Sequence, residues 1–139
     1  MEIFHDIEKN GCSEEDRRFE TAERMETCLA LLSVVAVRVF QLRCALDNQP
    51  NQPAEQVATA AEIEVVRRWT GAKGKRMTVR EFVRGVAKLG GFLGRKRDGE
   101  PGLRALWRGY QRLQDMLVGF QLHAGPAMPL GNCRDVGNR

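Results

Sequence analysis

Apolar side chains recur at helical spacing in three parts of the chain. Over residues 79–89 and again over residues 103–120, they fall three or four positions apart. This interval places them on one face of an α-helix. A third part, residues 25–46, is long and free of turn formers, and within it residues 28–37 are apolar nearly all round. We therefore expect this third helix to be the buried centre of a bundle.

Polar residues mark where the helices begin. Thr21 precedes the long apolar stretch, and Thr59 precedes a further helix expected at residues 60–69. Both are residue types that cap helix N-termini. Thr78 is followed three positions later by Glu81, which is the pattern of a capping box. These signals give the expected helices defined starting points.

Turn formers separate the helices, and no stretch alternates with period two. From residue 125 onward, three glycines and two prolines occur with little periodicity, so we expect a flexible tail over 125–139. The sequence therefore predicts an all-α fold, a small bundle of about four to five helices. The expected connections are residues 47–53, 70–76 and 92–102.

Charge is distributed unevenly along the chain. The formal net charge of the 139 residues is +4, yet residues 67–112 hold fourteen Lys and Arg against three Asp and Glu, for +11. Such a block attracts a polyanion, chiefly nucleic acid, through phosphate contacts and counterion release. A solvated basic face without a partner is the alternative.

The sharpest local feature is the run Arg95-Lys96-Arg97, which lies between Gly94 and Gly99 shortly before a helix. Three cations flanked by glycines suit the phosphate backbone of nucleic acid. A surface loop that is basic without a ligand is the alternative. The sequence therefore marks this loop as the first candidate for DNA contact.

Several function classes are disfavoured. The two serines, Ser13 and Ser33, are not in a nucleophile elbow, which argues against acyl transfer. The four cysteines form no CxxC pair, so zinc spacing is absent. No run of 18 apolar residues occurs and the N-terminus is acidic, so we expect neither a membrane span nor a secretory signal, and no membrane partner.

Carboxylates at the N-terminus are a weaker candidate site. Glu2, His5, Asp6 and Lys9 fall on one side of a short predicted helix. Such a face could hold a divalent metal, although phosphoryl-transfer sites usually draw two or more carboxylates from different elements. A solvated amphipathic helix end is the alternative.

Two blocks of sequence resemble bacterial cut-and-paste transposases of the Tn-five type, in the insertion-sequence-four family. The first runs over residues 24–43 and includes Leu31-Leu32-Ser33-Val34-Val35-Ala36-Val37-Arg38. The second runs over residues 89–109 and includes Leu89-Gly90-Gly91-Phe92-Leu93-Gly94-Arg95-Lys96. The resemblance covers about residues 1–122. It implies that residues 1–20 are a remnant of the catalytic RNase-H-like domain and residues 21–124 are a helical dimerisation domain.

The resemblance also implies roles for the N-terminal helix. Glu2-Ile3-Phe4-His5-Asp6-Ile7-Glu8-Lys9 is similar to a family signature helix in which the glutamate binds metal and the lysine contacts DNA. Glu2 is thus the candidate catalytic and metal-binding residue. The family uses Mg²⁺ or Mn²⁺ held by two further aspartates, which would lie before Met1. Since one carboxylate cannot hold two ions, we expect no cofactor in this chain and no catalysis by it alone.

Further site residues follow from the resemblance together with the sequence pattern. In the family, the loop matching Arg95 and Lys96 contacts transposon-end DNA, and a helix matching residues 115–124 forms most of the subunit contact. The expected residues for binding double-stranded DNA are Lys9, Arg17, Arg18, Arg24, Arg95, Lys96 and Arg97. The expected dimer interface comprises Leu113, Met116, Leu117 and Phe120.

Together these observations predict a transposase fragment with a role in DNA transposition. We expect a cytoplasmic, nucleoid-associated dimerisation module with residual affinity for transposon-end DNA. It would form a homodimer or a heterodimer with full-length transposase, and in the second case it could act as a dominant-negative inhibitor. Two alternatives stay open: a gene relic without a selected function, and an unrelated basic helical module that binds nucleic acid.

Overall fold

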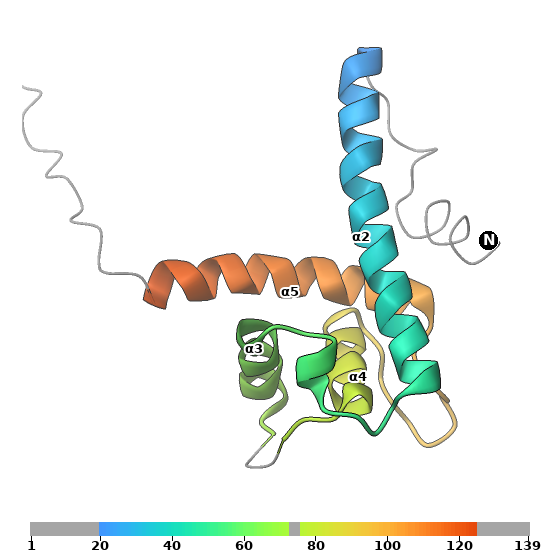
Figure 1. Cartoon of the computed structure of the whole chain (residues 1–139), viewed down its shortest axis with the longest axis vertical. Helices are drawn as coiled ribbons and strands as arrows, with labels where there is room; N and C mark the ends of the chain where they lie inside the picture. Colours follow the sequence, from blue (N-terminus) through green and yellow to red (C-terminus); the bar gives the residue numbers. More distant parts are fainter. Residues whose placement is uncertain (1–19, 73–75, 125–139) are drawn as a thin grey trace, which may run out of the picture.

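The computed structural model describes residues 20–72 and 76–124, and this part of the chain is mostly helical (Figure 1). Within it, the only β-type pairing is an isolated antiparallel bridge between Pro53 and Thr78. The prediction of a small all-α fold is confirmed. The elements are α2 (Ala22–Asn48), the short 3-10 helix η3 (Ala54–Gln56), α3 (Ala60–Thr70), α4 (Val79–Leu89) and α5 (Leu103–Ala124).

Three of the helices begin at the predicted threonines. The Thr21 side chain accepts a hydrogen bond from the backbone N–H of Arg24 at the start of α2. Thr59 and Thr78 each form a full capping box, with Glu62 and Glu81 respectively. In both boxes the glutamate carboxylate accepts the threonine backbone N–H at 2.8 Å. Local sequence therefore sets these helix starts.

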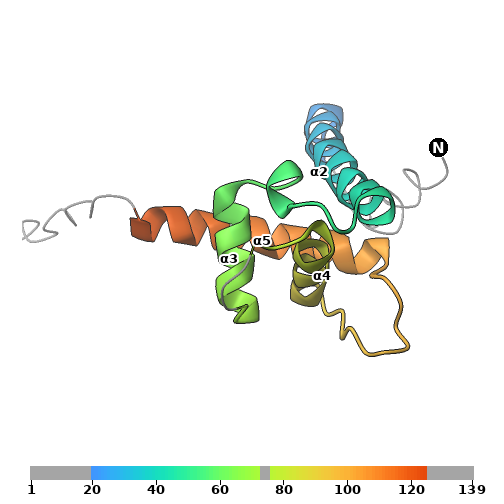
Figure 2. The ribbon, with the colours of Figure 1, turned by 60° about the horizontal axis from the view of Figure 1, so that its bottom comes forward.

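Helix α4 forms the middle of the bundle and contacts α2, η3, α3 and α5 (Figure 2). Its apolar side chains at the predicted interval, including Phe82, Val83 and Val86, are fully buried. Helix α5 crosses α4 so closely that a Cβ atom at Gly109 would lie 1.9 Å from the Val86 carbonyl oxygen. Gly90, at the end of α4, is equally crowded by the backbone of α5. This crossing fixes where the loop between the two helices emerges.

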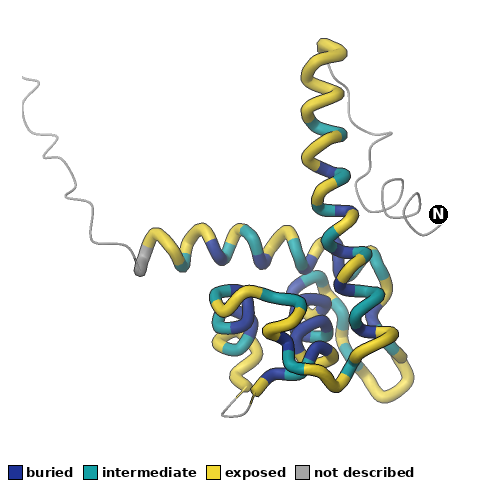
Figure 3. Tube along the Cα trace, in the orientation of Figure 1, coloured by how far each residue is buried: buried dark blue, intermediate teal, exposed yellow. Residues whose placement is uncertain are grey.

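The prediction that the long apolar helix is the buried centre of the bundle is wrong. Only one stripe of α2 is buried, and its first member is Leu32. Leu31 is 66% exposed and Val34 is 69% exposed. The N-terminal half of α2 projects beyond the other helices, as Figure 3 shows. A helix of 27 residues is about 40 Å long, which exceeds what α4 and α5 can cover.

Helix α2 is also long and apolar enough to cross a membrane by length and composition, which the sequence analysis did not anticipate. In the fold, however, two of its arginines bond to other segments of the chain. Arg38 donates to the Val57 carbonyl oxygen, and Arg43 donates to that of Pro101. Together with the burial of Val39, these bonds show the C-terminal half of α2 packed as a core helix.

Candidate dimer and nucleic-acid interface

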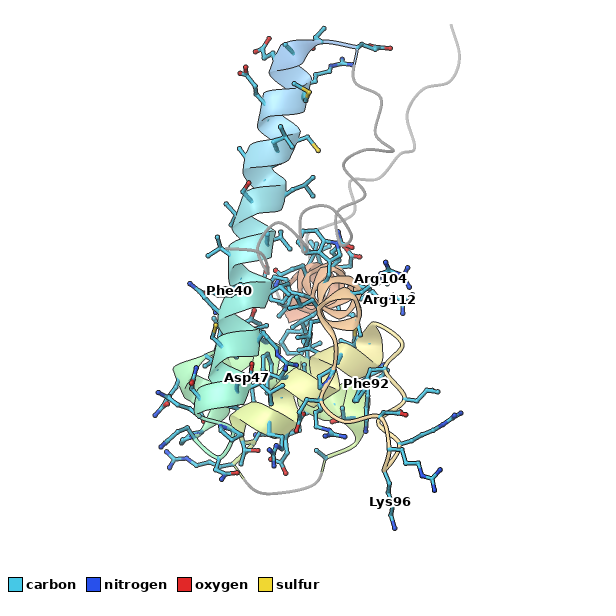
Figure 4. All side chains as sticks on the ribbon, turned by 90° about the vertical axis from the view of Figure 1, so that its right-hand side faces the viewer. Phe40, Asp47, Phe92, Lys96, Arg104 and Arg112 are labelled. Carbon is cyan, nitrogen blue, oxygen red and sulfur yellow. The ribbon has the colours of Figure 1, made fainter. Side chains whose placement is uncertain are left out.

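The loop between α4 and α5 displays the three predicted cations. Arg95, Lys96 and Arg97 are all exposed, and Lys96 extends away from the bundle (Figure 4). Asp98 closes the turn, since its carboxylate accepts the Arg95 backbone N–H at 2.8 Å and its own N–H donates to the Arg95 carbonyl oxygen. The turn leaves the cationic side chains directed outward.

The base of this loop is anchored to the bundle. Glu100 lies 3.3 Å from the guanidinium of Arg80 and 3.3 Å from that of Arg84, both on α4. Pro101 is buried, and its carbonyl oxygen accepts from Arg43 of α2 at 2.9 Å. The tip therefore presents its charges from a fixed support, which lowers the entropy lost on binding a ligand.

A second row of cations lies along α5. Arg104, Arg108 and Arg112 are exposed and occur at intervals of four residues. Arg112 also donates to the Leu89 carbonyl oxygen at the end of α4. In Figure 4, Arg104 and Arg112 extend to the side away from α2, above Lys96. These arginines belong to the basic block at residues 67–112. Their interval of four residues places them on one helix face, and this sequence signal could have identified them as a row.

Of the other predicted DNA-binding residues, Arg24 is the one that the structure describes, and it does not lie at this surface. Arg24 is exposed in the first turn of α2, where it pairs with Glu20 at 3.0 Å. That turn and the 92–102 loop lie at opposite ends of the molecule in Figures 1 and 2. Lys9, Arg17 and Arg18 lie outside the described residues.

The predicted metal ligand Glu2 also lies outside the described residues, as do the remainder of residues 1–19 and the 125–139 tail. Within residues 20–72 and 76–124, no three His, Cys, Asp or Glu side chains converge as a metal-binding group. The assignment of Glu2 and the division into residues 1–20, 21–124 and 125–139 stay predictions.

The predicted dimer stripe on α5 divides into two sets. Leu113 and Leu117 are buried within the chain. Met116 and Phe120 are half-buried and line a shallow apolar groove of about 430 Å³ together with Trp69 of α3, which is 46% exposed. The role of all four residues in a dimer stays a prediction, but only the second set is accessible to another subunit.

The outward face of α5 carries a further apolar pair that sequence analysis missed. Val118 is 58% exposed and Leu122 is 77% exposed. Four residues apart, they lie on one face of the helix, about half a turn from Leu113 and Leu117. The sequence did contain a signal for this pair, because Val118 and Leu122 are apolar but lie outside the helical stripe that includes Leu113 and Leu117.

A buried polar cluster around Glu62 was also missed. Glu62 is 5% exposed, and its carboxylate lies 3.7 Å from the guanidinium of Arg38 on α2. The Tyr110 hydroxyl and the Gln114 amide of α5 both approach its other oxygen at 3.5 Å. Burial raises the pKa of Tyr110, so its hydroxyl stays protonated and able to donate. The sequence signal for this cluster was the position of Glu62 among the apolar residues of 60–66.

This cluster ties α5 to two other helices, α2 and α3. Glu62 belongs to α3, Arg38 to α2, and Tyr110 and Gln114 to α5. A buried carboxylate with several partners constrains relative helix positions more sharply than apolar packing does. The cluster therefore helps to set the direction in which the far end of α5 extends.

Comparison with protein families places these features in context. The model of the family described as "Transposase Tn5 dimerisation domain" matches residues 34–124. The matched region begins within α2 and includes the cationic loop, the Glu62 cluster and all of α5. It covers 91 of the 139 residues, and such a domain serves subunit association in DNA transposition rather than catalysis. The chain therefore belongs to the family of Tn5-type transposase dimerisation domains.

Proposed function

We propose that this chain associates through the far end of α5, either with a second copy or with a transposase that contains the same domain. The exposed apolar pair Val118 and Leu122 carries this proposal. Two aliphatic side chains more than half exposed on one helix face gain free energy when a partner covers them. The groove beside Met116 and Phe120 offers further apolar surface on the same helix.

Charging this face is expected to weaken association. In the Val118→Glu/Leu122→Glu variant, four carboxylates would meet at a two-fold contact, so we expect the dissociation constant to rise by about 100-fold or more. Sedimentation equilibrium of the full chain measures this. The matched control is Leu31→Glu/Val34→Glu on the projecting half of α2, where both side chains are comparably exposed. An unchanged dimer in the α5 variant would contradict the proposal.

We propose that association with an intact transposase would make the chain an inhibitor, because the chain would occupy the contact surface through which two intact transposase molecules pair. The same two variants test this in a transposition assay with excess chain added. The unmodified chain and the α2 control are expected to lower the transposition frequency, and the α5 variant is not. Equal inhibition by all three would show that the effect does not pass through α5.

We further propose that the 95–97 loop binds the phosphate backbone of transposon-end DNA. Three exposed cations on an anchored turn support this proposal. Because the resemblance that suggested DNA contact places the metal-binding aspartates outside these residues, we propose binding without strand cleavage.

Neutralising the loop is expected to lower the salt dependence of DNA binding. Each phosphate contact contributes about 0.9 to the slope of log Kobs against log salt, so Arg95→Gln/Lys96→Gln/Arg97→Gln should reduce the slope by about 3. Fluorescence anisotropy with a mixed-sequence duplex of about 24 base pairs, titrated between about 50 and 200 mM NaCl, measures the slope. A slope unchanged from that of the parent chain would refute the loop assignment.

A further inference from the structure

A groove of about 310 Å³ lies between the end of α3 and the outer face of α4, apart from the 95–97 loop. Its polar lining is mainly cationic. Arg67 comes from α3, Arg76 from the segment that enters α4, and Arg84 and Lys88 from α4 itself. Glu81 is the acid in the lining, and its carboxylate already accepts two hydrogen bonds from Thr78.

Two of the four cations are held in place by carboxylates. Arg67 lies 3.6 Å from Glu64, and Arg84 lies 3.3 Å from Glu100. Neither Arg76 nor Lys88 has an ion-pair partner among the described residues, and both are exposed. The groove therefore combines positioned guanidinium groups with two cations whose charge is uncompensated nearby, an arrangement that favours an anion.

Two cations of the groove lining, Arg84 and Lys88, also lie close to Gly94 at the start of the loop that carries Arg95. A Cβ atom built at Gly94 would lie 3.6 Å from the terminal methylene of Lys88 and 3.8 Å from the guanidinium of Arg84. The Arg84 guanidinium also lies over the Phe92 ring, 5.5 Å from the ring centroid, within the distance of about 6 Å that is usual for a cation–π pair. Lys88 and Arg84 thus extend the cationic surface from the groove to the neighbours of Arg95.

We propose that the α3–α4 groove binds phosphate groups of the same DNA backbone that the 95–97 loop contacts. This inference rests on the proposed DNA binding and extends it to a second place on the surface. The groove suits phosphates rather than bases, because four of the six polar side chains in its lining are cationic. Cationic contacts to phosphates position a protein on DNA without reading its sequence.

Single neutralisations test the groove in the full chain. Arg76→Gln and Lys88→Gln should each lower the salt slope by about 0.9, and the double variant by about 2, with the mixed-sequence duplex described above. Arg68→Gln is the control, because it likewise removes one exposed positive charge but is not in the groove lining. Arg68 instead lies beside Phe120, with its guanidinium 5.1 Å from the ring centroid. The slope of this variant should stay close to that of the parent chain. Circular dichroism verifies that each variant is folded.

The outcomes separate this inference from the proposed function. A loop variant with a reduced slope beside a groove double variant with the parental slope would overturn the groove and leave the loop standing. An equal reduction in Arg68→Gln would also overturn the groove, because the effect would then reflect net charge alone. If the parent chain shows no salt-dependent binding, both proposals fail.

Discussion

Replacing Gly109 by alanine is expected to destabilise the protein by about 3 kcal/mol or more, or to prevent folding. The added Cβ would lie 1.9 Å from the carbonyl oxygen of Val86 and 3.1 Å from the backbone nitrogen of Gly90. Backbone atoms cannot rotate aside as a flexible side chain can, so α5 would have to move away from α4. The movement would loosen the packing around Leu106 and Leu113, which are fully buried. Urea unfolding followed by circular dichroism measures the loss.

Gly119→Ala on the same helix is the matched control. No atom lies within 4 Å of a Cβ built at Gly119, so the substitution removes backbone freedom without a clash. We expect it to stabilise the protein by up to about 1 kcal/mol, the usual difference between alanine and glycine within a helix. Both measurements need one fixed protein concentration, because association between copies would make the apparent stability depend on concentration. Equal stabilities of the two variants would show that the close helix crossing is not formed.

The second large effect is expected from Glu62→Ala, which should cost about 3 kcal/mol. The substitution leaves the guanidinium of Arg38 without its carboxylate and removes the acceptor for Thr59, Tyr110 and Gln114. Glu62→Gln keeps an acceptor oxygen at the same place, so its loss should be smaller. Thermal and urea unfolding at neutral pH measure both variants.

Glu81 provides a control with the same local role. It occupies the equivalent position of a second capping box, but it is exposed and its carboxylate bonds only to Thr78 in the described hydrogen-bond network. Glu81→Ala should therefore cost about 1 kcal/mol, the usual scale for a helix cap. The difference between the two glutamates isolates the contribution of the buried contacts. A loss no larger for Glu62→Ala than for Glu81→Ala would show that these contacts contribute nothing beyond the cap.

The helices and their beginnings could be predicted because their signals are local. The interval between Val79, Phe82 and Val83 places these side chains on one face whatever lies opposite. A threonine followed by a glutamate three residues later satisfies backbone N–H groups within its own first turn. The exposed position of the 95–97 cations likewise follows from the cost of burying charge.

Whether each apolar helix face is buried or exposed could not be predicted from local sequence signals. The apolar sequence of α2 predicted the buried centre of the bundle, because an apolar side chain does not by itself reveal whether another helix packs against it. Val34 and Val39 have the same side chain in the same helix, yet Val34 is 69% exposed and Val39 is fully buried. Val34 lies between the buried residues Leu32 and Ala36 but points to the opposite face of α2, and α4 and α5 pack against one face of this helix only.

The amino-acid sequence by itself determined where the helices form, where they begin, and which loop carries the cationic run, because hydrogen bonds within one turn and side-chain periodicity decide these features. Only the tertiary structure decided that Leu113 turns inward while Leu122 stays exposed, that Glu62 meets Arg38, and that Arg76 and Lys88 line one groove. These features depend on contacts between residues far apart in the chain. The close crossing of α4 and α5 at Gly90 and Gly109 decides which of these contacts form, because it brings particular faces of the two helices together.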